Sequence, residues 1–130
     1  MRRSIYAEER LRKETLSAIK TSEDRGHIVW SKVLVIVTDK EIVAKEKASK
    51  TPSTKMIAAY EKIIEQCKDS IKENMEKLGA NEECIAELMK YVDNSDTDNA
   101  QILLLKLLVK RNPGMFSRKL AACESRVNQK

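Results

Sequence analysis

The chain has 130 residues, of which 42% are hydrophobic and 35% are charged, and its formal net charge at pH 7 is +5. A hydrophobic fraction near the globular average excludes a chain too polar to fold and a membrane-embedded protein, and the length suits one domain over residues 1–130. Glycine and proline occur only three and two times, so few residues interrupt a helix and the composition predicts an all-α fold.

Two further features concern the compartment. The N-terminal segment MRRSIYAEERLRKE lacks the apolar core of a signal peptide, and the apolar run at 102–105 is far shorter than the roughly 20 residues that span a bilayer. The three cysteines are an odd number without CxxC spacing, which favours buried free thiols. We therefore expect an intracellular protein in a reducing compartment, cytoplasm or nucleus, with no membrane contact.

The N-terminal part of the chain predicts a helix from about Ile5 to Gly26, followed by a segment of ambiguous conformation. Nine of the sixteen residues 28–43 are β-branched, which favours strand, and a hairpin turning at TDKE is one alternative. TDKE also matches a capping box with Thr38 as N-cap, and an isolated hairpin is marginal in stability. The balance favours a helix, or two short helices, over 28–43.

The clearest predicted element is a long amphipathic helix at about 54–78. Its apolar residues form one stripe over about seven turns, and TPS at 51–53 and Gly79 mark its ends, with Pro52 at the first helical position. Such a helix spans nearly 38 Å, longer than a compact domain of this size easily covers, so we expect an overhang and self-association as a dimer. The candidate interface residues are Met56, Tyr60, Ile63, Ile71 and Met75.

Three more helices follow in the sequence. Asn81 caps a short helix, and Thr97 or Asp98 caps an apolar helix at about 99–111 that we expect in the middle of the bundle, with Leu104 and Leu107 in the core. After Asn112 and Pro113, a final helix places Phe116, Leu120, Cys123 and Val127 on one side. The whole pattern predicts a compact bundle of about five to six helices.

The charge is unevenly distributed along the chain. Residues 51–105 carry six basic and eleven acidic side chains, whereas residues 106–130 carry seven basic and one acidic, and the N-terminal segment is also basic. The basic ends either bind the phosphates of a nucleic acid or pair with the acidic middle. The candidate nucleic-acid or anion contacts are Lys110, Arg111, Arg118, Lys119, Arg126, Arg2, Arg3, Arg10, Arg12 and Lys13.

The sequence contains no recognisable motif for catalysis or for a cofactor. His27 is the single histidine, the three glycines are isolated, and neither a metal-ligand spacing nor a phosphate-binding loop is visible. We therefore expect no catalytic residues, no metal and no cofactor. The sequence favours a non-enzymatic interaction module, an adaptor or regulatory subunit that docks to a protein partner or to itself, with nucleic-acid binding through the basic ends as the alternative.

Overall fold

The computed structural model describes residues 5–129, with the side chains of residues 22–129. This part of the chain is all-helical and contains five helices: α1 (Ile5–Lys47), α2 (Thr54–Lys77), α3 (Glu82–Asp93), α4 (Thr97–Arg111) and α5 (Pro113–Asn128). The predicted all-α fold is thereby confirmed. None of the described helices contains a stretch both long and apolar enough to span a membrane.

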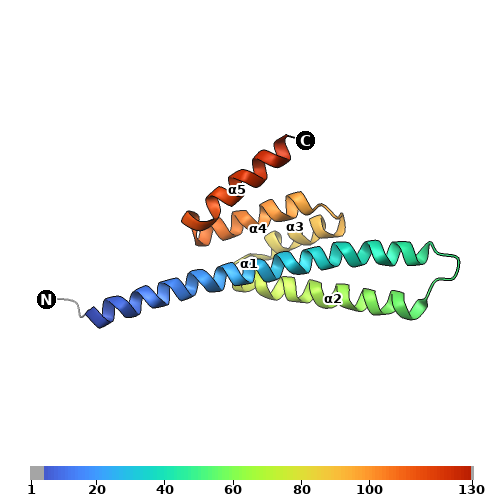
Figure 1. Cartoon of the computed structure of the whole chain (residues 1–130), viewed down its shortest axis with the longest axis horizontal. Helices are drawn as coiled ribbons and strands as arrows, with labels where there is room; N and C mark the ends of the chain where they lie inside the picture. Colours follow the sequence, from blue (N-terminus) through green and yellow to red (C-terminus); the bar gives the residue numbers. More distant parts are fainter. Residues whose placement is uncertain (1–4, 130) are drawn as a thin grey trace.

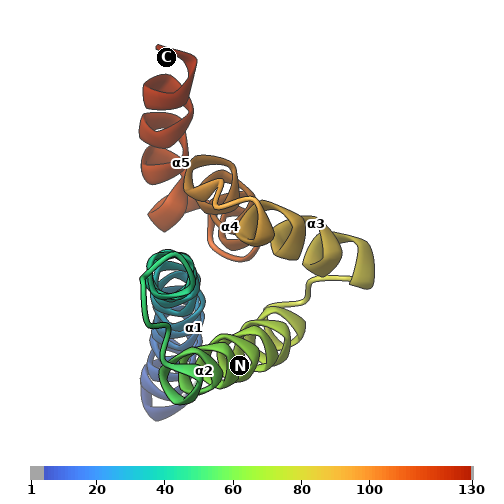
Figure 2. The same ribbon diagram turned by 90° about the vertical axis from the view of Figure 1, so that its right-hand side faces the viewer.

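The helices form a long hairpin with a second, smaller group packed on one side. α1 and α2 run antiparallel, and α3 and α4 lie together against them (Figure 1). The end-on view shows α4 next to α1, with α5 on the far side of α4 from the hairpin (Figure 2). One face of the α1–α2 hairpin is therefore covered by α3 and α4, and the opposite face is not.

α1 is a single 43-residue helix, so two of the sequence-based expectations were wrong. The helix does not end at Gly26, and Thr38 lies inside it instead of capping a new one. The β-branched segment 28–43 is helical because its side chains are held by tertiary packing, which overrides strand propensity. Within this segment the buried apolar residues of α1 are Val29, Val33, Ile36 and Val43.

Gly26 lies inside α1 because α4 approaches closely at this point. A Cβ atom on Gly26 would lie 2.8 Å from Cδ1 of Leu108, a core residue of α4. A glycine that looks like a helix end in the sequence is therefore a packing position between two helices.

α2 and α3 begin and end close to the predicted residues. Ser53, and not Pro52, is the last residue before α2, and its hydroxyl accepts a hydrogen bond from the Met56 amide at 3.2 Å. Gly79 ends α2 with a φ of +87°, and the Asn81 side chain caps α3 by accepting from the Cys84 amide at 2.8 Å. These caps fix the turn that brings α3 back along α2.

α4 lies between α1 and α5 and also packs against α3. Its N-cap is Asp96, one residue before Thr97 and two before Asp98, the two predicted caps, and the Asp96 carboxylate accepts from the Asn99 amide at 3.2 Å. Leu104 is buried as expected, whereas Leu107 is half-buried against the core. α5 starts at Pro113 and packs on α4 mainly through Phe116, which is 3% exposed.

Candidate interaction surface

Side-chain contacts join α1 and α2 near both ends of the hairpin. Near its open end the Arg25 guanidinium donates to the Asn74 side-chain oxygen at 3.3 Å, and near the loop the Ser53 amide donates to the Glu46 carboxylate at 2.8 Å. The Lys47 ammonium also lies 3.2 Å from the Glu61 carboxylate. Together these contacts place Val35 and Ile63 in the same central stretch of the hairpin.

A band of uncharged residues follows the hairpin face that α3 and α4 leave uncovered. On both helices its members are spaced alternately three and four residues apart, the spacing of a coiled-coil seam. All of them are exposed or half-buried, in a chain where 35% of residues are charged. The uncharged band consists of Ile28, Ser31, Val35, Thr38 and Ile42 on α1 and Met56, Ala59, Ile63, Gln66 and Ser70 on α2.

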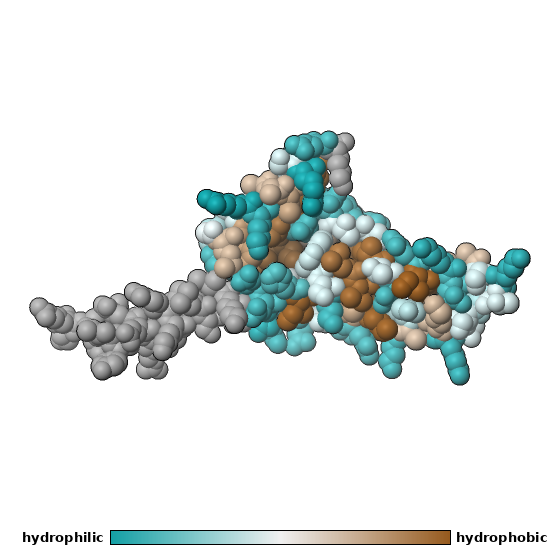
Figure 3. All heavy atoms as spheres, viewed as in Figure 1, coloured by the Kyte–Doolittle hydropathy of each residue, from teal (hydrophilic) through white to brown (hydrophobic). Residues whose placement is uncertain are grey.

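Helix geometry places both halves of this band on the same side. The Lys40 ammonium donates to the Asp93 carbonyl of α3, and the Lys68 ammonium lies 3.2 Å from the Asp93 carboxylate, so these two lysines mark the covered side of the hairpin. Val35 and Ile63 lie on the other side of the line where α1 meets α2. Hydrophobic surface over both helices is visible in Figure 3.

Two apolar residues of the band are unusually exposed for their size. Ile28 is 42% exposed and Ile63 is 39% exposed. Leu34 is also 42% exposed; it is not a member of the band but lies at its edge, where it lines one open hollow with Ser31, Val35 and Thr38. An apolar seam left open to water is a surface suited to covering by another protein.

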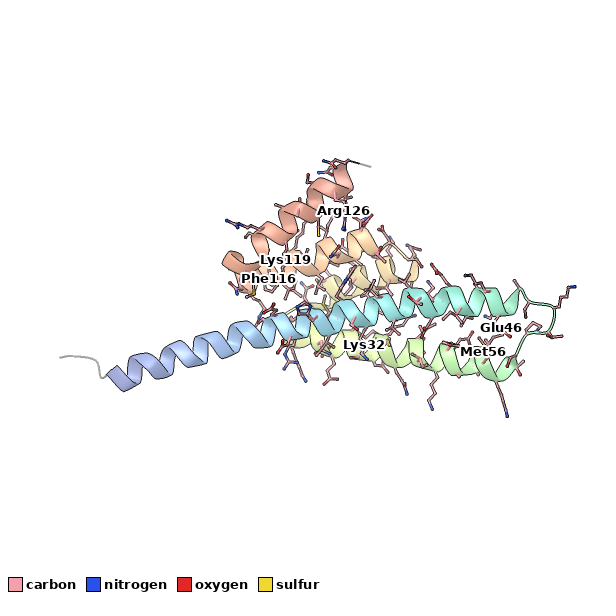
Figure 4. All side chains as sticks on the ribbon, viewed as in Figure 1. Lys32, Glu46, Met56, Phe116, Lys119 and Arg126 are labelled. Atoms are coloured by element: carbon pink, nitrogen blue, oxygen red, sulfur yellow. The ribbon has the colours of Figure 1, made fainter. Side chains whose placement is uncertain are left out.

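A row of charged residues runs between the two halves of the band, along the line where α1 meets α2. Its members are spaced seven residues apart on α1 and none is fully exposed. Figure 4 shows Lys32 and Glu46 on the hairpin, with Glu46 near the loop. In chain order the charged row consists of Arg25, Lys32, Asp39 and Glu46.

Asp39 is the most buried member of this row, with 8% of its surface exposed. Its carboxylate has no hydrogen bond or ion pair with any described side chain, and Lys32 likewise has none. Neither oxygen of this carboxylate is buried, and Asp39 lines an open hollow on α1 together with Ser31 and Val35 of the band, so its charge faces the side on which a partner would dock. Neither Asp39 nor Lys32 was among the sites predicted from the sequence, although the seven-residue spacing was visible in it.

The predicted interface residues of α2 divide into two groups. Ile71 and Met75 are fully buried against the rest of the bundle and do not reach the surface. Met56 and Tyr60 are half-buried, and Ile63 is exposed. The overhang expected for α2 is absent because the long α1 covers its whole length, so the reason given for a dimer does not apply, and the open surface lies on a different face.

The predicted cationic residues of α4 and α5 are all exposed, but two of them have partners. The Arg126 guanidinium lies 3.5 Å from the Asp98 carboxylate and donates to the Gln101 side chain at 2.9 Å, and Arg111 donates to the Leu78 carbonyl at 2.9 Å. Lys119 lies over the Phe116 ring, 5.7 Å from its centroid. Lys110 and Arg118 have no hydrogen bond or ion pair with the described side chains.

The predicted N-terminal cations lie outside the part of the chain whose side chains the structure describes. Arg2 and Arg3 precede the first described residue, and Arg10, Arg12 and Lys13 belong to α1 without described side chains.

Hollows also lie between the helices away from this surface. An open groove of about 710 Å³ lies between α2 and α3, and a smaller pocket of about 120 Å³ lies where α1, α4 and α5 meet. Leu104, Leu105, Leu108 and Phe116 form the apolar lining of the pocket, and His27, 3.7 Å from Glu23, lies at its edge. The groove is lined mostly by charged or polar residues of both signs: Lys72, Glu76, Glu82, Lys90, Asp93 and Asn94.

Local contacts raise the pKa values of two side chains of α3, Cys84 and Tyr91. Burial raises the pKa of the Cys84 thiol, and Glu87 raises it further, while Lys110 acts in the opposite direction. The hydrogen bond from the Tyr91 hydroxyl to Glu87, 3.0 Å long, raises the pKa of Tyr91. All three cysteines are free thiols, and the described residues contain no group of three or more ligands placed to hold a metal ion.

Comparison with known proteins adds no relative: the chain matches no protein-family model, no curated protein and no solved structure.

Proposed function

We propose that this protein is a non-enzymatic helical interaction module, an adaptor or regulatory subunit, that docks a protein partner, including a second copy of itself, on the uncharged band. The observation that carries the proposal is the band itself. Ten uncharged residues in coiled-coil spacing occupy the one face of the hairpin that α3 and α4 leave uncovered. A partner helix laid along this face would bury Ile28 and Ile63 and extend the hairpin into a larger bundle.

Ile28 and Leu34 provide a matched test of this proposal. Both lie on α1 and both are 42% exposed, but only Ile28 belongs to the band. Ile28→Glu should abolish association, measured both as proteins retained from a cell extract on the immobilised chain and as self-association. Leu34→Glu, at the edge of the band, should weaken both less. At protein concentrations low enough for the chain to be monomeric, neither change should shift the urea unfolding midpoint strongly, because neither residue is in the core.

The outcome that would contradict the proposal concerns the same two variants. If Ile28→Glu and Leu34→Glu behave like the parent protein in both measurements, the band is not a docking surface and the proposal fails.

A second candidate function, binding of nucleic-acid phosphates, is favoured by one observation, the exposed cations Lys110, Arg118 and Lys119 at the junction of α4 and α5. Contacts to phosphates require positive charge alone and no aromatic residues. Retention on a nucleic-acid column, compared between variants of these cations, separates the two functions.

A further inference from the structure

From the order of charges along the charged row, we infer that the partner on the uncharged band is a second copy of this chain, bound antiparallel, so that two hairpins form a four-helix bundle. This inference rests on the proposed function, because it names the occupant of the same surface. Two features of the hairpin support it: the order of charges in the row and the symmetric spacing of the apolar residues on α1.

The charged row is self-complementary when one copy is reversed. It reads positive, positive, negative, negative from Arg25 through Lys32 and Asp39 to Glu46, and its midpoint lies between residues 35 and 36. A two-fold axis at this level and perpendicular to the helices brings Lys32 of one protomer to the level of Asp39 of its partner. The same axis brings Arg25 to the level of Glu46, so every member of the row meets the opposite charge.

The apolar residues of the band fit the same axis. On α1, Val35 meets Val35 of the partner protomer, and Ile28 meets Ile42. On α2, the five residues of the band are centred on Ile63, which lies in the same central stretch of the hairpin. In the resulting bundle every pair of adjacent helices is antiparallel, an arrangement known for four-helix bundles.

Asp39 shows what the second copy supplies. The residue as a whole is 8% exposed, but neither of its carboxylate oxygens is buried, and neither Asp39 nor Lys32 has an ion pair with a described side chain. In the antiparallel dimer, Asp39 of each protomer lies at the level of Lys32 of the other protomer, so this pair of opposite charges occurs twice across the interface. A parallel dimer would instead place Lys32 against Lys32 and Asp39 against Asp39, which like-charge repulsion disfavours.

The inner charge pair allows a test with single substitutions. Lys32→Glu should place negative charge against Asp39 of the partner, and Asp39→Lys should place positive charge against its Lys32. Each variant alone should dimerise at least about 10-fold more weakly than the parent chain. An equimolar mixture of the two variants restores both opposite-charge pairs, so it should form a one-to-one heterodimer with an affinity close to that of the parent.

Sedimentation equilibrium of the full 14.8 kDa chain and of the mixture measures these outcomes. Glu41→Lys on α1 and Lys106→Glu on α4 are matched controls, because both residues are exposed and lie outside the band and the row. These controls should dimerise like the parent chain. If Asp39→Lys does not fold, the less buried outer pair gives the same test through Arg25→Glu mixed with Glu46→Lys.

Two results would overturn the second copy as the occupant: a monomeric parent chain at high micromolar concentration, or single variants that weaken the dimer without recovery in the mixture. Failure here remains distinguishable from failure of the proposed function. If the parent is monomeric but loses captured proteins on Ile28→Glu and keeps more of them on Leu34→Glu, only the identity of the partner is wrong.

Discussion

Gly26 has a sequence context typical of a helix end, but in the structure it lies at a packing contact between two helices. Glycine is common just after a helix C-terminus, and the predicted helix end rested on this preference. In the structure Gly26 is buried within α1, where the absence of a side chain lets Leu108 of α4 pack directly on the backbone. Its role depends on a residue 82 positions later in the chain, so no local pattern could reveal it.

The packing at Gly26 predicts that the effect of Gly26→Ala on the free energy of unfolding depends on the residue at position 108. Alanine favours a helix over glycine by about 1 kcal/mol, but its methyl group would overlap Cδ1 of Leu108, and overpacking costs about 1–3 kcal/mol. Gly26→Ala should therefore fail to stabilise the parent protein, whereas it should stabilise a Leu108→Ala background, where the space is vacant. Urea unfolding of the four chains of this double-mutant cycle gives the coupling, and an equal effect in both backgrounds would contradict the close contact.

At the scale of helices, α2 was predictable because every local signal agreed. It has one apolar stripe, a serine cap and a terminal glycine with positive φ, and it runs from Thr54 to Lys77 against the predicted 54–78. Segment 28–43 was not predictable in the same way, because its β-branched residues fit a strand as well as a helix. Packing on α2 and α4 decides in favour of the helix, and this packing is absent from local sequence.

The candidate surface was less predictable than the fold. The seven-residue spacing of Ile28, Val35 and Ile42 is visible in the sequence, but such spacing marks a buried side of a helix as readily as an open one. Only the positions of α3 and α4 show which side remains uncovered. For the same reason the prediction of Ile71 and Met75 as interface residues was wrong, because they belong to the core.

α4 provides the prediction at this scale. Leu104 is 4% exposed and Leu107 is half-buried, so the two leucines should differ in their contribution to stability. Leu104→Ala should lower the free energy of unfolding by about 2–5 kcal/mol, and Leu107→Ala by less, about 1–2 kcal/mol, because part of its side chain is already in water. Urea unfolding at one fixed protein concentration measures both, since self-association would add to the stability. A cost for Leu107→Ala equal to that of Leu104→Ala would place Leu107 in the core.

For the whole molecule, the charge asymmetry of the sequence becomes an arrangement of helices. The basic C-terminal helix α5 folds back along α4, which brings Arg126 to Asp98 and Gln101 near the α4 N-terminus. Part of the positive charge at the C-terminus is thus paired with the acidic middle of the chain, while Arg118 and Lys119 stay exposed. Arg126 therefore pairs within the fold, whereas Arg118 and Lys119 remain the candidates for phosphate binding.

This division gives the last prediction, in which Arg126→Gln is compared with the pair Arg118→Gln and Lys119→Gln. Arg126 is 55% exposed and Asp98 28%, so removal of their ion pair should cost less than about 1 kcal/mol in urea unfolding, and the pair of changes should cost nothing measurable. We expect weak retention on a nucleic-acid column for the parent and all variants alike, because docking on the hairpin does not use α5. The contrary outcome is that the double variant elutes earlier than the parent. The slope of its binding constant against salt concentration would then fall by roughly 0.9 for each duplex-DNA phosphate that the variant no longer neutralises. In that case Arg118 and Lys119 bind phosphates, and the second candidate function gains the stronger support.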